Sequence, residues 1–214
     1  IFRLTNEKWI HIEEDILNKE KLKEVIISCQ PDIVIHMAAQ AIVKTGYLKP
    51  IETWETNVNG TLNLLNALKF NRRNCALIVV TTDKVYENVD DLKIFKEEDK
   101  LGGHDPYSAS KAAVELIVSS WRKSFLINQE ENCNLKVATA RAGNVIGGGD
   151  NAKDRIVPDS IKALLSGNKI PLRNPSYSRP WQHVLECLNG YLILTEKLVK
   201  DSNDSIDTFN FGPN

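Results

Sequence analysis

The sequence predicts an α/β fold in which helices cover both faces of a parallel sheet. Short runs rich in valine, isoleucine and alanine, such as "DIVIHMA" and "ALIVVTT", lack the polar alternation of a half-exposed strand, which is typical of strands buried on both faces. Longer stretches with apolar residues at helical spacing lie between these runs. Strands and helices that alternate along a chain predict a doubly wound sheet.

The predicted elements follow one another along the chain. Strands are expected at three apolar runs, Asp32–Ala38, Ala76–Thr82 and Leu135–Arg141. Helices are expected at Lys19–Cys29, Ile51–Phe70 and Pro106–Phe125, the last with Val114, Ile117, Val118 and Trp121 on one face. Two segments are expected to be irregular, the polar stretch Glu87–Gly103 and the Pro- and Arg-rich stretch Arg173–Trp181.

Composition argues against several classes of protein. With 214 residues, 42% hydrophobic residues and a formal net charge of −1, the chain can bury a sizeable core and has no basic bias toward nucleic acid. Its apolar runs are far shorter than the ~20 residues that span a bilayer. The cysteines have no CxxC or His-rich neighbours, which indicates reduced thiols of a cytoplasmic protein and no metal site: Cys29, Cys75, Cys133 and Cys187.

Chemistry is expected just after the strands, because open parallel sheets bind ligands beyond the carboxyl ends of their strands. After the first strand, the small Ala38 and Ala39 would let a flat ligand approach the backbone, although tight packing against a helix explains them equally well. After the second strand, Thr82, Asp83 and Lys84 offer a hydroxyl, a carboxylate and an ammonium in succession. A solvated turn is the simpler interpretation of these three residues.

The segment "HDPYSASKAAVELI" combines a tyrosine and a lysine at the start of a helix. Asp105 can cap this helix, Pro106 suits its first turn, and Tyr107 and Lys111 share one face at i and i+4. An ammonium near a phenol favours the phenolate, which lowers the tyrosine pKa and produces a usable general base. The pair also occurs by chance in many helices, so its value depends on the neighbouring motifs.

Four motifs in order, "HMAAQ", "TNVNGT", "TTDK" and YxxxK, give the chain a resemblance to the extended short-chain dehydrogenase/reductases that act on nucleotide sugars, whose fold is of the Rossmann type. Two longer segments, "RAGNVIGGGDNAKDRIVPD" and "RNPSYSRPWQHVLE", are similar to the 4,6-dehydratases of this family, specifically the branch that acts on CDP-glucose. The resemblance covers nearly the whole chain.

The resemblance implies NAD as the cofactor and a role for each residue of the YxxxK and TTDK motifs. Tyr107 would take the proton of the sugar 4-hydroxyl, and Lys111 would hold the nicotinamide ribose and lower the tyrosine pKa. Thr82 would hydrogen-bond the oxygen that becomes the 4-ketone. Asp83 would supply the proton with which the 6-hydroxyl leaves. Lys84 stands where dTDP-glucose dehydratases usually carry glutamate, and its ammonium would have to lose a proton before it could act as the base at C5.

Binding residues also follow from the resemblance. The cofactor is expected to meet Asp15, Ile16, Ala38, Ala39 and Gln40, besides Tyr107 and Lys111. Asn57 matches a structural asparagine of the family. The substrate is expected to meet Asn144, Arg155, Arg173, Arg179 and His183. Guanidinium groups suit a diphosphate because they donate paired hydrogen bonds to phosphate oxygens, although a single arginine is more often a surface charge and a lone histidine more often a core residue.

The resemblance further implies the organisation of the chain. We expect a partial NAD-binding domain at residues 1–142, and substrate-binding segments with remaining elements of the sheet at residues 143–214. The glycine-rich turn that binds pyrophosphate in this family has no counterpart here and is expected upstream of Ile1, while the sugar-binding portion is expected to continue beyond Asn214.

A homodimer is also expected. Two of the predicted helices, Ile51–Phe70 and Pro106–Phe125, carry more apolar residues than one buried face requires, including Leu62, Leu65, Ile117 and Trp121. The family pairs these helices across a two-fold axis.

Two alternatives remain open. A nucleotide-sugar epimerase or decarboxylase, or a dehydratase for another nucleotide sugar, would share Tyr107 and Lys111. The sequence "TDK" at Thr82–Lys84 argues against an epimerase, which needs no acid at Asp83. A non-catalytic homologue would be expected to lose the tyrosine or the lysine, and both are present.

Overall fold

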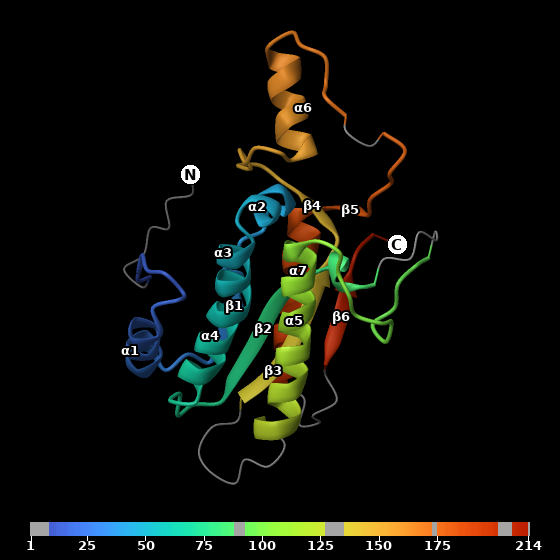
Figure 1. Cartoon of the computed structure of the whole chain (residues 1–214). Helices are drawn as coiled ribbons and strands as arrows, with labels where there is room; N and C mark the ends of the chain where they lie inside the picture. Colours follow the sequence, from blue (N-terminus) through green and yellow to red (C-terminus); the bar gives the residue numbers. More distant parts are fainter. Residues whose placement is uncertain (1–8, 88–92, 127–134, 173–174, 201–206, 214) are drawn as a thin grey trace.

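The computed structural model describes residues 9–87, 93–126, 135–172, 175–200 and 207–213. Within these ranges, four parallel strands form one sheet in the order β1-β2-β3-β6 (Figure 1). The strands are β1 (Ile33–His36), β2 (Cys75–Thr82), β3 (Leu135–Ala142) and β6 (Thr208–Phe211). The register pairs His36 with Val79 and Thr82 with Ala142, so the carboxyl ends of the strands lie along one edge.

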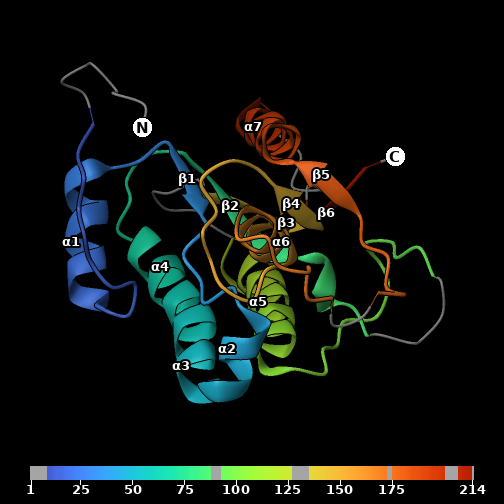
Figure 2. The same ribbon diagram turned by 90° about the horizontal axis from the view of Figure 1, so that it is seen from above.

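Helices cover both faces of this sheet. Figure 2 shows α7 (Val184–Lys200) on one side of the strands, and α1 (Lys19–Cys29), α4 (Gly60–Leu68) and α5 (Pro106–Trp121) on the other. The predicted doubly wound α/β fold is therefore confirmed.

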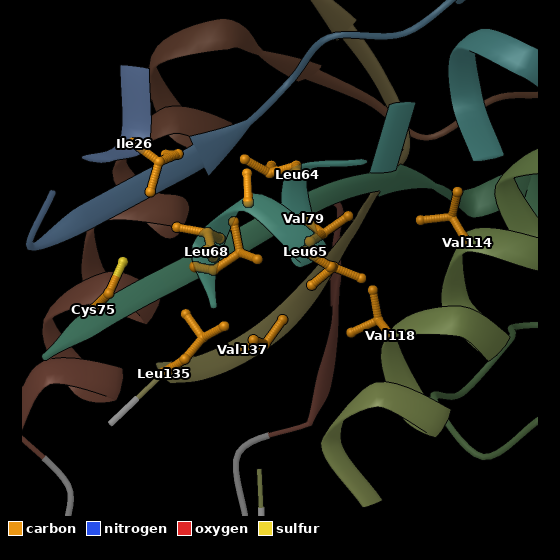
Figure 3. Packing of buried hydrophobic residues seen from close by; sticks show 12 residues of the cluster. Ile26, Leu64, Leu65, Leu68, Cys75, Val79, Val114, Val118, Leu135 and Val137 are labelled. Atoms are coloured by element: carbon orange, nitrogen blue, oxygen red, sulfur yellow. The ribbon is translucent and has the colours of Figure 1, made fainter. Parts of the chain in front are cut away.

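The core reflects the period of two in the central strands. In β2, Leu77 and Val79 are fully buried against the side chains of α4 and α5, among them Leu65 and Val118 (Figure 3). The alternate residue Ile78 belongs to a second cluster that packs on α7. Because both faces of β2 are covered, this strand reads as a continuous apolar run in the sequence.

The predicted elements agree with the structure to within a few residues. Helix α1 has the predicted bounds, and the cap is Asn18, whose side chain accepts from the N–H of Lys21. The single helix predicted over Ile51–Phe70 consists of α3 (Pro50–Trp54), a π-helical turn η1 (Glu55–Asn59) and α4. The helix that begins at Pro106 likewise ends in a π-helical turn, η3 (Arg122–Leu126).

Several elements lie where no element was predicted. They are α2 (Val43–Leu48), the short 3-10 turn η2 (Asp83–Val85), β4 (Asn144–Ile146), α6 (Ile156–Leu165), β5 (Trp181–His183) and α7. Strands β4 and β5 form a separate parallel pair in which Asn144 lies opposite Trp181. Helix α6 projects away from the main sheet (Figure 1). Since α7 and β6 pack on and in the main sheet, the division of the chain near residue 142 stays a prediction.

The outer face of the helices differs from the expectation in one respect. Leu65 is fully buried in the core and cannot contribute to a surface. Leu62, Ile117 and Trp121 are partly covered. The large apolar side chains that α3, α5 and η3 expose are instead Ile51, Trp54, Leu116 and Phe125.

No helix within the described ranges is long and apolar enough to cross a membrane. The same residues contain no group of three or more His, Cys, Asp or Glu side chains that could hold a metal ion.

Candidate active site

The first turn of α5 is fixed by its cap. Oδ1 of Asp105 accepts hydrogen bonds from the backbone N–H groups of Tyr107 and Ser108, each at 3.0 Å, and Oδ2 accepts from the Ser108 hydroxyl at 2.6 Å. Pro106 occupies the first turn, where its missing N–H has no cost. This confirms the predicted cap and holds Tyr107, which is buried, at one position beside the sheet.

Two of the predicted residues, Thr82 and Asp83, act on Tyr107 at the end of β2, and a third, Lys84, lies beside Asp83. The hydroxyl of Thr82 donates to Oδ1 of Asp83 at 3.0 Å, and a hydrogen bond also joins Thr82 to Tyr107. Nζ of Lys84 lies 3.8 Å from Oδ1 of Asp83, and both side chains are about one third exposed. The structure thus brings Thr82, Asp83, Lys84 and Tyr107 together at the carboxyl edge of the sheet.

The environment of Tyr107 raises its pKa above the ordinary value of 10, chiefly because the phenol is buried. The hydrogen bond with Thr82 lowers the pKa, the charge of Asp83 raises it, and the charge of Arg155 lowers it. In this structure Tyr107 is therefore a phenol at neutral pH. The lowering of its pKa by Lys111 stays a prediction.

Lys111 lies one turn further along α5 and is buried. Its ammonium donates to the carbonyl oxygen of Val80 in β2 at 3.0 Å. Burial lowers its pKa from 10.5 to about 8, against an opposing effect of the Glu115 carboxylate. Of the three N–H donors of an ammonium, one is directed at Val80, so others are available for a ligand hydroxyl.

His36, at the end of β1, is a site residue to which sequence reasoning assigned no role. Its Nε2 lies 3.0 Å from Oγ1 of Thr61, and that hydroxyl donates to the carbonyl of Asn57 at 2.7 Å. Since the Thr61 proton is used there, Nε2 of His36 carries the donated hydrogen. Burial and the charge of Lys111 lower the pKa of His36 from 6.5 to about 4, so the ring is neutral at physiological pH. The sequence feature that could have indicated a role for His36 is its position inside an apolar run of the kind that forms a buried strand.

Asn57 fixes the segment that follows β1. Its Oδ1 accepts from the backbone N–H of Gln40 at 2.8 Å, and its Nδ2 donates to the Gln40 carbonyl at 3.1 Å and to the Ser110 hydroxyl at 2.9 Å. Ser110 in turn donates to the carbonyl of Tyr107 at 2.8 Å. One asparagine thus ties the predicted cofactor segment to the helix of Tyr107, as expected of a structural residue.

The other predicted cofactor segment packs on the same helical stretch. Ile16 is close enough to Gly60 that a Cβ at this glycine would lie 2.7 Å from Cγ2 of Ile16, and Asn63 donates to the Ile16 carbonyl at 3.2 Å. The Asp15 carboxylate is exposed and accepts from the N–H of Leu17 at 2.8 Å. Both predicted segments therefore converge on residues 57–63.

The residues after β1 fit a flat ligand. Ala38 is exposed and Ala39 is half-buried, so their small side chains leave the backbone accessible, while Gln40 is held by Asn57. Together with the ammonium of Lys111, these residues offer small contacts and a charged donor. This set suits the ribose and nicotinamide end of NAD.

The predicted substrate residue Arg155 lies near Tyr107, because its charge lowers the pKa of that residue. Its guanidinium is exposed and pairs with Oδ2 of Asp150 at 3.2 Å. Asn144 begins β4, and its Oδ1 is buried without a hydrogen-bond partner among the described atoms.

The remaining substrate residues lie around β5. The guanidinium of Arg179 is exposed and lies 5.7 Å from the centre of the Tyr177 ring. His183 is exposed, so the alternative of a buried core histidine is wrong; its Nδ1 accepts from the N–H of Leu185 at 3.2 Å, in the first turn of α7. Arg173 lies outside the described residues.

The parallel sheet, with a YxxxK helix at its carboxyl edge, defines a Rossmann-type α/β protein. The chain belongs to the GDP-mannose 4,6 dehydratase family, whose model matches residues 3–208. The CDP-glucose 4,6-dehydratase of Salmonella typhimurium (strain LT2) is 43% identical over 215 residues, which make up 100% of this chain and 59% of that protein. The resemblance to nucleotide-sugar dehydratases is therefore confirmed, and the chain spans 59% of the length of this relative.

Two solved structures have the same fold. The dTDP-glucose 4,6-dehydratase of Bacillus anthracis str. Ames, in complex with NAD, is 25% identical with a TM-score of 0.75, over 95% of this chain and 58% of that one. The UDP-glucose 4-epimerase of Thermus thermophilus, also in complex with NAD, is 26% identical with a TM-score of 0.76, over 93% and 62% of the two chains.

Proposed function

We propose that the protein containing this sequence is an NAD-dependent CDP-glucose 4,6-dehydratase. One observation carries the proposal: Thr82 is hydrogen-bonded both to Asp83 and to Tyr107, so a phenol, a hydroxyl and a carboxyl group line the same strand end. The reaction converts CDP-D-glucose to CDP-4-keto-6-deoxy-D-glucose and water, and needs these three groups. The family and the 43% identical Salmonella relative support the choice of substrate.

The cofactor of this reaction is NAD. When bound, it accepts the C4 hydride of the sugar and later returns that hydride to C6. Asp15 and Ile16 would meet the adenosine end, while Ala38, Ala39 and Gln40 would flank the nicotinamide. The buried Lys111 would donate to the nicotinamide ribose from its position against Val80. The Bacillus and Thermus neighbours, solved with NAD, support this assignment.

The oxidation step uses Tyr107 and Thr82. The phenolic oxygen of Tyr107 takes the proton of the sugar 4-hydroxyl, and the Thr82 hydroxyl donates to the oxygen that becomes the ketone. Their hydrogen bond in this structure places both groups around one point, where O4 of the sugar would lie. Since burial raises the Tyr107 pKa, the positive charge of Lys111 is needed to favour the phenolate.

The elimination step uses Asp83 and Lys84. Once C4 is a ketone, the adjacent C5 proton becomes acidic, and a base can remove it while the 6-hydroxyl leaves. Asp83 supplies the proton that turns the 6-hydroxyl into water. Lys84, 3.8 Å from Asp83, is placed to take the C5 proton once its ammonium has lost one.

The nucleotide sugar is assigned to Asn144, Arg155, Arg173, Arg179 and His183. Arg155 is the best supported of the arginines, because its charge acts on Tyr107 although its guanidinium is exposed. A guanidinium in this position can donate two parallel hydrogen bonds to a diphosphate. We assign the nucleotide to this side of Tyr107 and the cofactor to the side of Lys111.

An epimerase is the second candidate, because the Thermus neighbour and other relatives are epimerases. The arrangement at Asp83 favours the dehydratase. An epimerase returns the hydride to C4 and expels no hydroxyl, so it has no use for an acid hydrogen-bonded to Thr82.

The wider setting of the enzyme follows from the reaction. A 4-keto-6-deoxy sugar nucleotide is a precursor of deoxysugars, so we place the enzyme in the cytoplasm, in the biosynthesis of surface polysaccharide such as lipopolysaccharide. We also propose a homodimer, formed by α3–η1–α4 and α5.

The experiment incubates the whole protein and NAD with CDP-glucose, and in parallel with the UDP, dTDP and GDP sugars. Mass spectrometry should show a product that has lost one water from CDP-glucose and far less product from the others. Formation of CDP-galactose, which has the same mass as CDP-glucose and is distinguished from it by NMR, would instead identify an epimerase.

A further inference from the structure

Glu115 is a buried carboxylate that the proposed mechanism does not use. It lies on α5 one turn beyond Lys111 and is 3% exposed. Its Oε1 accepts from the Thr81 hydroxyl at 2.5 Å, and its Oε2 accepts from the Thr139 hydroxyl at 2.7 Å and from Nη2 of Arg141 at 3.0 Å. The carboxylate therefore ties the catalytic helix to β2 and β3 at once.

The partner of Glu115 is equally buried. The Glu115 and Arg141 side chains are 2% and 4% exposed. Nη1 of Arg141 donates to the Tyr86 hydroxyl at 2.8 Å and to the Glu97 carbonyl at 3.0 Å. Removing two charges from water is so costly that a buried ion pair often adds little to the stability of the folded protein. A role connected with the site is therefore the more informative interpretation.

We propose that Glu115 is a positioning residue that keeps the Lys111 side chain cationic and in place at the end of β2, where the proposed reaction needs an ammonium. This inference rests on the proposed function. Residues four apart on a helix lie on the same face, so Glu115 is the anion that α5 presents to Lys111. Its bond to Thr81 fixes it next to Thr82, the residue that Tyr107 contacts.

Among the groups that surround Lys111, Glu115 is the one whose charge favours the protonated ammonium. From β2 it meets the carbonyl of Val80, and from β1 the neutral His36. From its own helix, the charge of Glu115 acts on it. Burial alone drives the ammonium toward the neutral amine, and Glu115 opposes this change.

The groups that face Glu115 are cations. They are Arg141 from β3 and Arg122 from η3. Without the carboxylate, Arg141 would be an uncompensated buried cation, and its repulsion would favour the neutral form of Lys111 further.

The test is Glu115→Gln, which removes the charge and can preserve the hydrogen bonds. The amide oxygen can take the place of Oε2 and accept from Thr139 and Arg141. The amide nitrogen can donate to Thr81, whose hydroxyl can turn to the Ala140 carbonyl, 3.4 Å away. The matched control is Thr139→Val, which removes a hydrogen bond of Glu115 and keeps its charge.

The first readout is the pKa of Lys111 in the whole protein without cofactor, followed by NMR on lysine labelled with ¹³C at Cε and assigned with Lys111→Arg. The wild type should titrate near 8, and Glu115→Gln should titrate lower by about 1–2 units, the usual effect of losing a nearby opposite charge. Thr139→Val should titrate like the wild type. An unchanged Lys111 pKa in Glu115→Gln would overturn the inference.

The second readout is the dependence of NAD affinity on pH. In Glu115→Gln, affinity should fall at pH 7.5 by about tenfold and recover toward the wild-type value near pH 6, where Lys111 is protonated again. A loss of the same size at both pH values would mean a purely structural role. If the Lys111 pKa shifts as expected but no variant binds NAD or makes product, the proposed function fails while the role of Glu115 stands.

A second variant guards against misfolding. Should Glu115→Gln not fold, Glu115→Gln/Arg141→Gln removes both members of the pair and leaves no unpaired buried charge. It should also lower the Lys111 pKa, although by less than Glu115→Gln does, because the repulsion of Arg141 is removed as well; a wild-type value in this variant would overturn the inference.

Discussion

Thr82 connects the two halves of the proposed reaction at the level of single atoms. Its one hydroxyl proton is directed at Asp83, and its oxygen also meets Tyr107 and the backbone N–H of Lys84. A substrate oxygen that enters this point must take over one of these hydrogen bonds. The Thr82 hydroxyl can therefore hydrogen-bond the substrate during oxidation at C4, and it also contacts Asp83, which protonates the leaving 6-hydroxyl in the later step of the proposed reaction.

Tyr107→Phe in the whole protein removes the proposed acceptor of the 4-hydroxyl proton. Turnover should fall by ~10²–10⁴, the usual effect of losing a general base, while the fold is kept because the ring still fills its buried site. Steady-state kinetics with CDP-glucose measures the change. The exposed Tyr47 provides a control: Tyr47→Phe should leave turnover as it is. Comparable rates for wild type and Tyr107→Phe would refute the role of Tyr107.

Asp83→Asn should separate the two half-reactions. The amide keeps an acceptor for the Thr82 hydroxyl but cannot donate the proton with which the 6-hydroxyl leaves. Reduced cofactor should therefore accumulate at 340 nm after mixing with CDP-glucose, while product appears slowly. Equal slowing of the absorbance rise and of product formation would mean that Asp83 acts earlier, in the oxidation.

The elements around the site are held by a few close contacts between backbones. Gly103 has a φ of +155° and lies against the first turn of α5, where an added Cβ would be 2.5 Å from the backbone nitrogen of Ala109. The loop before α5 and the helix with Tyr107 thus form one unit. Asp105 and Asn57 secure the same turn from two other directions.

Gly103→Ala should destabilise the protein by about 1–3 kcal/mol, because neither the backbone of Ala109 nor a positive φ can adapt cheaply. Urea unfolding measures the difference in the free energy of unfolding. The control is Gly148→Ala, since nothing lies within 4 Å of a Cβ at that position. If both variants unfold at the same urea concentration, the close packing of Gly103 on α5 is not present in solution.

His36 should make the stability depend on pH. Its pKa is about 4 in the folded protein against 6.5 for an ordinary histidine, so between these values the unfolded chain binds more protons and stability falls as the pH is lowered. The contribution is at most about 3.5 kcal/mol, at ~1.4 kcal/mol per pKa unit. His36→Gln, which keeps a donor for Thr61, should flatten the pH dependence of the urea midpoint between pH 7 and pH 4.5. A slope identical to the wild type would argue against a neutral buried ring.

The sequence was sufficient to predict elements with a strong hydrophobic period. It was insufficient where contacts between residues distant in the chain determine the local structure. Helix α1 and strand β2 could be predicted because their apolar pattern has one interpretation. The π-helical turn at Asn57 could not be predicted, because in this turn the Asn57 side chain hydrogen-bonds Gln40 and Ser110, which are far away in the chain. The TTDK and YxxxK motifs indicated the site, but the burial that raises the Tyr107 pKa and lowers that of Lys111 is a property of the packed structure.

At the scale of the whole molecule, the layer of helices on the face of the sheet opposite α7 has an outer surface with exposed apolar side chains. Helices α4 and α5 bury their inner faces on the sheet, yet the layer exposes Leu116, Trp54 and Phe125 at 61%, 39% and 48%. Nζ of Lys69 lies 4.7 Å from the centre of the Phe125 ring. An apolar surface with a basic rim is suited to a second copy of the same surface.

Leu116→Glu should therefore convert the proposed homodimer of the whole protein to a monomer. A carboxylate in the centre of a two-fold interface meets its own copy, so the repulsion acts together with the cost of burying both charges. Light scattering after size exclusion, at micromolar concentration, measures the mass. Leu165→Glu on α6 is the control, since Leu165 is 84% exposed away from this surface and should leave the dimer intact. A monomeric wild-type protein would contradict the homodimer. A Leu116→Glu variant that remains dimeric would show that the interface lies elsewhere.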